Sequence, residues 1–269
     1  GTLPQYCSCT GVGYSVFKDT SSPVLLTAGT SQQYTGLIID GDSTAAYGIQ
    51  ATGNSTEFTR VKIQNTTSYD YYNSLGSLGN IIKYSIFGIT LLQATTSEID
   101  TCFYNSPTRS IIGHGDATKR TVLLEHNKLI VDLTAQSATT RQLFELRGNI
   151  ALTIIDNNVT TSVIRGWFGR LASGTNNDNQ LVFSYNNCTD ILNDNDLYYL
   201  RVAEGTYQRF TTIQIDNNAF TMNDDLLYSA VRIEGNDVAT IYNNNITTNG
   251  TTSGGGVNVL YVNTSVNVY

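Results

Sequence analysis

Three segments at similar spacing in the second half of the chain carry aspartates, an arginine and a tryptophan. The segments are RGW at 165–167, NDND at 193–196 and NDD at 223–225, and they hold the only tryptophan of the sequence. An indole ring can bind the apolar face of a sugar, while carboxylates and a guanidinium bind its hydroxyls. The residue types therefore predict a glycan-binding groove. Its candidate residues are Arg165, Trp167, Asp194, Asp196, Asp224 and Asp225.

Carboxylates from neighbouring repeats could also cleave a glycan, because a close pair can supply an acid and a base or nucleophile. Glu204 and Glu234 each precede a glycine one repeat apart, and Arg201 and Arg232 are near enough in sequence to neutralise them. Two alternatives stay open: the two glutamates form a surface ion ladder, or the aspartates are ordinary solvated turn residues. The catalytic candidates are Asp194, Asp196, Asp225, Glu204 and Glu234.

No other signature of catalysis or cofactor binding is found in the sequence. It has no P-loop, dinucleotide GxGxxG, HExxH, GxSxG or twelve-residue calcium loop, so we predict neither a cofactor nor a metal site. His114 has no assignable acidic or nucleophilic partner. The cysteines, whose spacing fits no zinc motif, are predicted to be buried thiols, with a Cys102–Cys188 disulfide as the alternative. They are Cys7, Cys9, Cys102 and Cys188.

Composition limits the classes of partner. The chain has 269 residues, 40% of them hydrophobic and only 14% charged, with a net charge of −7. An acidic chain without a basic run is a poor nucleic-acid binder, and no apolar run reaches the length of a membrane span. We therefore expect no nucleic-acid partner and no membrane insertion. The chain starts at Gly1 without a signal peptide and is interpreted as a processed product or a piece of a longer polypeptide.

An internal repeat indicates how these residues are positioned. Short apolar runs end in asparagine as VLLEHN, TIIDNN, VFSYNN, IQIDNN and TIYNNN, at Asn127, Asn158, Asn187, Asn218 and Asn245. A second run ends in glycine at Gly148, Gly174, Gly205 and Gly235, and both markers recur every 26 to 31 residues. Repeats of this length, made of two or three short strands, predict an all-β parallel β-helix of about nine coils.

The repeated asparagines have a structural explanation in such a fold. Equivalent residues of successive coils lie about 4.8 Å apart, so stacked asparagines can form a ladder of amide hydrogen bonds. The inward stack before this corner is expected to contain Ile155, Ser184, Ile215 and Ile241. His126 is expected to replace an asparagine of the ladder, in the position that other coils fill with Asn157, Asn186, Asn217 and Asn244.

The chain divides into two predicted parts. Residues 1–35 lack the repeat and are expected to form an N-terminal leading segment or cap, and residues 36–269 form the β-helix. A solenoid needs covered ends, because bare end coils expose unpaired strand edges. No capping helix follows the C-terminal strand pattern, so we expect a partner subunit or missing flanking sequence to cover that end.

The segments LIIDGD, AAYGIQATGN and FTRVKIQNTT resemble the pectin-lyase-like parallel β-helix superfamily, and are most like phage tailspike and tail-fibre β-helices. The resemblance implies that the predicted parallel β-helix is right-handed and single-stranded. The resemblance implies a homotrimer that binds host-surface glycans, located on a virion or outside the cell. We therefore expect a virion attachment protein of the tailspike type. The alternatives are a polysaccharide depolymerase, either a hydrolase or a lyase, and an extracellular adhesin or filament subunit.

Overall fold

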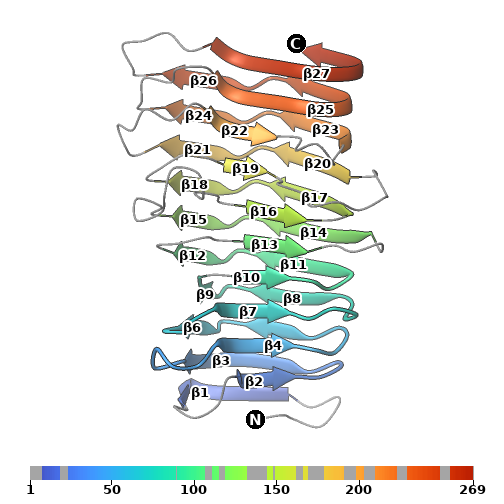
Figure 1. The fold of residues 1–269 in the computed structure, drawn as a ribbon. Helices are drawn as coiled ribbons and strands as arrows, with labels where there is room; N and C mark the ends of the chain where they lie inside the picture. The colour runs from blue at the N-terminus through green and yellow to red at the C-terminus, as the bar shows by residue number, and fades with distance from the viewer. Residues whose placement is uncertain are drawn as a thin grey trace.

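A computed structural model describes residues 8–18, 24–88, 90–106, 111–114, 119–131, 144–147, 149–161, 166–168, 179–190, 198–202, 210–222, 229–248 and 255–268. The described residues form β-strands and no helix, and every strand pairing among them is parallel. Each strand pairs with its counterpart from the next coil, so the chain climbs from β1 (Ser8–Lys18) to β27 (Gly255–Val268) as one β-solenoid (Figure 1). The predicted fold class is confirmed.

Each coil contributes strands to three stacked rows. The first row comprises β3 (Gln33–Asp40), β5 (Glu57–Thr59), β8 (Asn80–Lys83), β11 (Thr96–Asp100), β14 (Arg120–Glu125), β17 (Ile150–Ile155), β20 (Asn179–Ser184), β23 (Phe210–Asp216) and β25 (Ser229–Tyr242). The second row comprises β6 (Lys62–Gln64), β9 (Ile86–Phe87), β12 (Phe103–Ser106), β15 (Lys128–Val131), β18 (Asn158–Thr161), β21 (Asn187–Asp190), β24 (Ala219–Met222) and β26 (Asn245–Thr248). The third row comprises β2 (Val24–Ala28), β4 (Tyr47–Ala51), β7 (Tyr69–Asn73), β10 (Thr90–Leu92), β13 (Ile111–His114), β16 (Phe144–Arg147), β19 (Gly166–Phe168) and β22 (Tyr198–Val202).

Coil length varies along the solenoid. Hydrogen bonds between equivalent residues of successive coils give the coil length in residues. It is 24 near the N-terminus and 17 from Gly79 to Thr96. Along the second half it is 30, 29, 32 and 26. Coil length therefore departs from the expected 26–31 residues. The coil count also differs from the predicted nine, since β1 and β27 extend the stack beyond the nine first-row strands named above. The predicted division between an N-terminal segment (1–35) and the β-helix (36–269) stays a prediction. Parallel strand pairing continues across residue 36, because β2 pairs with β4.

The corner between the first and second rows is built from residues with left-handed backbone. In each first-row strand, one residue follows the last position that pairs in register with the neighbouring coil. That residue has a φ between 50° and 68°. Such a φ value is uncommon outside glycine, and asparagine and aspartate tolerate it best. This corner column comprises Gly36, Arg60, Tyr84, Thr101, His126, Asp156, Tyr185, Asn217 and Asn243.

From His126 onward, the residue after each corner position belongs to the predicted asparagine ladder. Each Nδ2 donates to the Oδ1 of the next asparagine over 2.9–3.1 Å. The chain of bonds joins Asn127, Asn157, Asn186, Asn218 and Asn244. The existence of the ladder is confirmed, but its predicted register is wrong in part: Asn158, Asn187 and Asn245 are exposed first residues of β18, β21 and β26.

His126 is not a substitute for a ladder asparagine, because the ladder position of its coil is filled by Asn127. His126 lies instead in the corner column, at a φ of 53°. Toward the N-terminus the ladder continues through other side chains. The Cys102 backbone N–H donates to Asn127 Oδ1 over 2.8 Å, and the Cys102 thiol donates to the carbonyls of Asp100 and Ile82. Burial raises the pKa of Cys102 to about 12, so this thiol keeps its proton.

Cys102 and Cys188 are both buried thiols, as predicted, and no disulfide joins them. Cys7 lies outside the described residues, and the side chain of Cys9 is not described.

The interior is a column of apolar side chains along the solenoid axis. Near the N-terminus it is aromatic: the Tyr34 and Phe58 rings stack at 5.1 Å, and Phe58 meets Tyr71 edge-on at 5.7 Å. In the second half, Ile154, Phe183, Ile215 and Ile241 lie in register and are all buried. The expected inward stack was therefore wrong at Ile155 and Ser184, which lie one position further along. There Ile155 is half-buried, and Ser184 Oγ donates to Asp216 Oδ1.

Tyr71→Phe is expected to stabilise the protein by about 1 kcal/mol, because a buried hydroxyl without a partner carries a desolvation penalty. Tyr71 is fully buried, and its Oη has no hydrogen-bond partner among the described residues. Urea unfolding measures the change. The matched control is Tyr34→Phe, which removes a hydrogen bond of 2.7 Å to Gln32 Oε1 and should destabilise. Equal effects of the two substitutions would contradict the prediction.

Candidate functional site

Most of the predicted groove lies outside the described residues, namely Arg165, Asp194, Asp196, Asp224 and Asp225, together with the catalytic candidate Glu204. Trp167 and Glu234 are placed by backbone alone, in β19 and β25. The groove and the catalytic assignments therefore stay predictions.

Backbone register nevertheless gives Trp167 neighbours that the sequence count did not assign to it. Trp167 in β19 pairs with Arg201 in β22, and Arg201 pairs with Arg232 in β25. Glu234, two residues after Arg232, pairs with Leu260 in β27. The long strand β25 continues the third row with residues 229–233 before it joins the first row. The third row thus places one tryptophan and two arginines at equivalent positions of successive coils.

The described residues contain a cluster of aromatic side chains on the third row, near the N-terminal end. The rings of Tyr47 and Tyr69 stack with centroids 5.9 Å apart and planes inclined by 5°. The Tyr72 ring lies 5.6 Å from that of Tyr47 at an inclination of 34°. All three are half-buried, whereas Tyr71, which lies between Tyr69 and Tyr72 in sequence, points into the core. We call Tyr47, Tyr69 and Tyr72 the tyrosine face.

Strand alternation explains how β7 supplies both the core and the surface. Successive side chains of a strand point to opposite sides of the sheet, so Tyr71 faces inward and Tyr72 outward. In-register pairing of β4 with β7 places Gln50 beside Tyr72 and Tyr47 beside Tyr69. Tyr47 and Tyr69 are the first residues of their strands and are half-buried, although alternation alone would place Tyr69 on the same side as Tyr71. The sequence analysis did not use Tyr47, because its partner lies in the next coil and only the register reveals the pair.

Polar groups flank the tyrosine face. Tyr72 Oη donates to Gln93 Oε1 over 2.8 Å, and Gln50 Nε2 donates to Ser74 Oγ over 3.4 Å. Asp70 is directed elsewhere: it accepts hydrogen bonds from Thr66 Oγ1 and from the Gly88 backbone N–H. Burial raises the pKa of Asp70 above its ordinary value, and these two hydrogen bonds oppose the shift. The surface around the rings therefore offers the half-buried amides of Gln50 and Gln93 together with the tyrosine hydroxyls, whereas Ser74 is buried.

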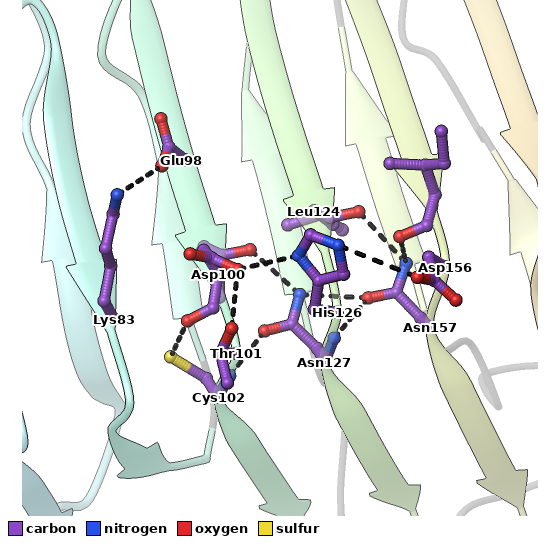
Figure 2. A network of polar contacts seen from close by, with 12 residues as sticks. Lys83, Glu98, Asp100, Thr101, Cys102, Leu124, His126, Asn127, Asp156 and Asn157 are labelled. Carbon is purple, nitrogen blue, oxygen red and sulfur yellow. Dashed lines mark hydrogen bonds and ion pairs between the residues drawn. The ribbon is translucent and has the colours of Figure 1, made fainter.

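A group of ionisable side chains lies at the corner between the first and second rows (Figure 2). His126 Nδ1 lies 3.1 Å from Asp100 Oδ1, and His126 Nε2 lies 3.7 Å from Asp156 Oδ2. Glu125 belongs to the same group, since one ligand atom each of Asp100, Glu125 and His126 lie within 4.8 Å of one another. We call Asp100, Glu125, His126 and Asp156 the corner cluster.

Register and backbone together create the corner cluster. Asp100 and Glu125 pair in register at the ends of β11 and β14, which stacks their side chains on one side of the sheet. His126 and Asp156 follow in the corner column, and the imidazole lies between the two aspartates in Figure 2. The hydrogen bond to Asp100 raises the pKa of His126 above its ordinary value, and the charges of Glu125, Asp100 and Asp156 add to the shift.

The parallel coils, the asparagine ladder and the left-handed corner define a parallel β-solenoid that is consistent with the pectin-lyase-like β-helix fold. No protein-family model matches the chain, and no curated protein matches it in sequence. The residues that the structure describes include no helix capable of crossing a membrane.

Sequence reasoning missed the corner cluster, although a signal for it was present. EHN at 125–127 and IDNN at 155–158 carry acidic residues or histidine just before the ladder asparagine, and EID at 98–100 ends the preceding first-row strand. Aligning the repeats on the second asparagine of each pair placed His126 in the ladder. Aligning them on the corner residue instead would have grouped His126 with Asp156.

Proposed function

We propose that this protein binds glycans through the tyrosine face, as a structural attachment protein of the tailspike type. The observation that supports the proposal best is the contact of three half-buried tyrosine rings on neighbouring strands of the third row. Ring faces bind the C–H surface of a sugar, and phenol hydroxyls with nearby amides bind its hydroxyls. Both kinds of group are present here.

Charge favours a neutral glycan over a strongly anionic one. The net charge of the chain is −7, and an acidic protein repels a polyanion at long range. The described polar groups beside the rings, Gln50, Ser74 and Gln93, are uncharged. We therefore propose a neutral, hydroxyl-rich host-surface polysaccharide as the ligand.

The assembly belongs to the same proposal. A rod of parallel coils can lie side by side with two copies of itself, and the resemblance to tailspikes favours a homotrimer on a virion or outside the cell. Flanking sequence would join it to a larger particle. Light scattering of the protein alone measures this part of the proposal: a mass three times that of the chain is expected, and a monomer at high concentration would contradict it.

Tyr72→Ala is expected to weaken binding to the best ligand of a neutral polysaccharide panel by about tenfold, which corresponds to about 1.4 kcal/mol for the loss of one ring. Tyr47→Ala should weaken binding at least as much, because it removes the ring that contacts both neighbours. Biolayer interferometry with immobilised oligosaccharides measures the affinities.

The matched control is Tyr84→Asn. Tyr84 is 56% exposed but lies in the corner column at a φ of 51°, which asparagine tolerates. This variant should bind like the wild type. Unchanged binding in both tyrosine-face variants would contradict the proposal. Release of oligosaccharide during incubation would favour the depolymerase, and end-to-end filaments would favour the filament subunit.

A further inference from the structure

We propose that the corner cluster binds one divalent transition-metal cation of the Zn²⁺ type. Its donors would be Asp100, Glu125 and His126, with Asp156 as an outer partner. An imidazole nitrogen combined with two carboxylate oxygens suits Zn²⁺ and its first-row neighbours better than Ca²⁺ or Mg²⁺, which prefer oxygen ligands alone. This site is separate from the tyrosine face and does not depend on it.

The distances approach those of a tetrahedral site. Zn²⁺ bonds of 2.0–2.2 Å set neighbouring ligand atoms about 3.3 Å apart. His126 Nδ1 and Asp100 Oδ1 already lie 3.1 Å apart, so a cation can replace the proton between them with little movement. The ligand atom of Glu125 completes a group within 4.8 Å and has to move inward by rotation of its side chain.

Neighbouring groups already orient two of the ligands. Thr101 Oγ1 donates to Asp100 Oδ1 over 2.7 Å, which holds that carboxylate in place. On the far side of the imidazole, Asp156 Oδ2 lies 3.7 Å from His126 Nε2. A histidine that binds a metal through one nitrogen usually donates the other N–H to a carboxylate, and Asp156 is positioned for that role.

The local charge favours a cation. Asp100, Glu125 and Asp156 surround one imidazole. Lys83, which pairs in register with Asp100, makes an ion pair with Glu98 Oε1 at 3.2 Å. Because His126 is about half exposed, an ion can reach the group from solvent. A fourth position facing solvent would be open to water or to a further ligand.

Isothermal titration with ZnCl₂ tests the site on the full chain. The wild type is expected to bind one equivalent saturably at this site, whereas Ca²⁺ and Mg²⁺ should give no saturable signal at the same concentrations. His126→Asn and Asp100→Asn should each weaken this binding by at least thirtyfold. Asp156→Asn should weaken it by about tenfold, as for other outer-shell partners.

Asparagine is the chosen replacement because the corner column already contains it at Asn217 and Asn243, so His126→Asn should keep the fold. An unchanged melting temperature without metal checks this. His114→Asn serves as a control that should bind Zn²⁺ like the wild type. No saturable Zn²⁺ binding, or the same affinity in His126→Asn as in the wild type, would overturn the proposal.

Discussion

Asn157→Ala should lower the free energy of unfolding by about 3–4 kcal/mol, because several buried polar groups lose their partners at once. Asn157 Nδ2 donates to the carbonyls of Leu124 and Ile155 and to Asn186 Oδ1. Its Oδ1 accepts from the backbone N–H and from Nδ2 of Asn127. Alanine removes all of these bonds in the middle of the ladder. Urea unfolding of the purified variant measures the loss.

The neighbouring asparagine provides the control. Asn158 is exposed at the start of β18, so Asn158→Ala should change the free energy of unfolding by no more than about 0.5 kcal/mol. Asn157→Asp keeps the shape but directs an oxygen at the Leu124 and Ile155 carbonyls, and should destabilise at least as much as alanine. If the alanine variants at 157 and 158 unfold at the same urea concentration, the ladder does not stabilise the fold as described.

Gly53→Ala should destabilise the protein by about 4 kcal/mol or more, because overpacking against backbone cannot be relieved by a side-chain rotation. A Cβ at position 53 would overlap the Thr30 backbone nitrogen and the Gly29 carbonyl carbon, and would lie 2.6 Å from the Gly29 oxygen. The Gly53 backbone N–H also donates to the Ala28 carbonyl of the preceding coil. Adjacent coils would therefore have to separate. Thermal unfolding and the yield of folded protein measure the effect.

Gly76→Ala is the control that distinguishes the steric contact at Gly53 from the strain of a left-handed backbone. Gly76 has a φ of 84°, and a Cβ there would meet nothing within 4 Å, so alanine should cost only about 1 kcal/mol of conformational strain. A Gly53→Ala variant as stable as Gly76→Ala would show that the close approach of the two coils is not as described.

The fold could be predicted because the residues that form its main corner repeat in the sequence. Apolar runs ending in asparagine mark a corner that recurs in coil after coil, and the ladder follows from stacking them. The exact register could not be predicted, because the asparagine pairs are not equivalent. In 157–158 the pair is a ladder residue and a strand start, whereas in 217–218 it is a corner residue and a ladder residue.

Coil lengths were harder to predict in the first half, where asparagine is replaced at the ladder position. Ser85 and Cys102 take that position, and their short side chains still bond to backbone carbonyls. A search for asparagine pairs cannot recognise them. The coil from Gly79 to Thr96 is also much shorter than the expected repeat.

The sites could be predicted less well than the fold, for a physical reason. Side chains that meet across coils are separated by coil length in sequence, so an error of one residue changes which groups come together. Tyr47 meets Tyr69 and Asp100 meets His126 only in the correct register. The sequence shows which residues have aromatic, acidic or imidazole side chains, but not which of these side chains meet in the folded protein.

Hydroxyl-radical footprinting of the wild-type protein, with and without its bound neutral polysaccharide, tests the central claim most directly. The proposal predicts that oxidation of Tyr47, Tyr69 and Tyr72, read by mass spectrometry, falls when the glycan is bound. Tyr84 and Tyr185, which are 56% and 58% exposed at the corner, should be oxidised equally in both samples. A bound glycan that leaves the tyrosine face as reactive as before would contradict the claim.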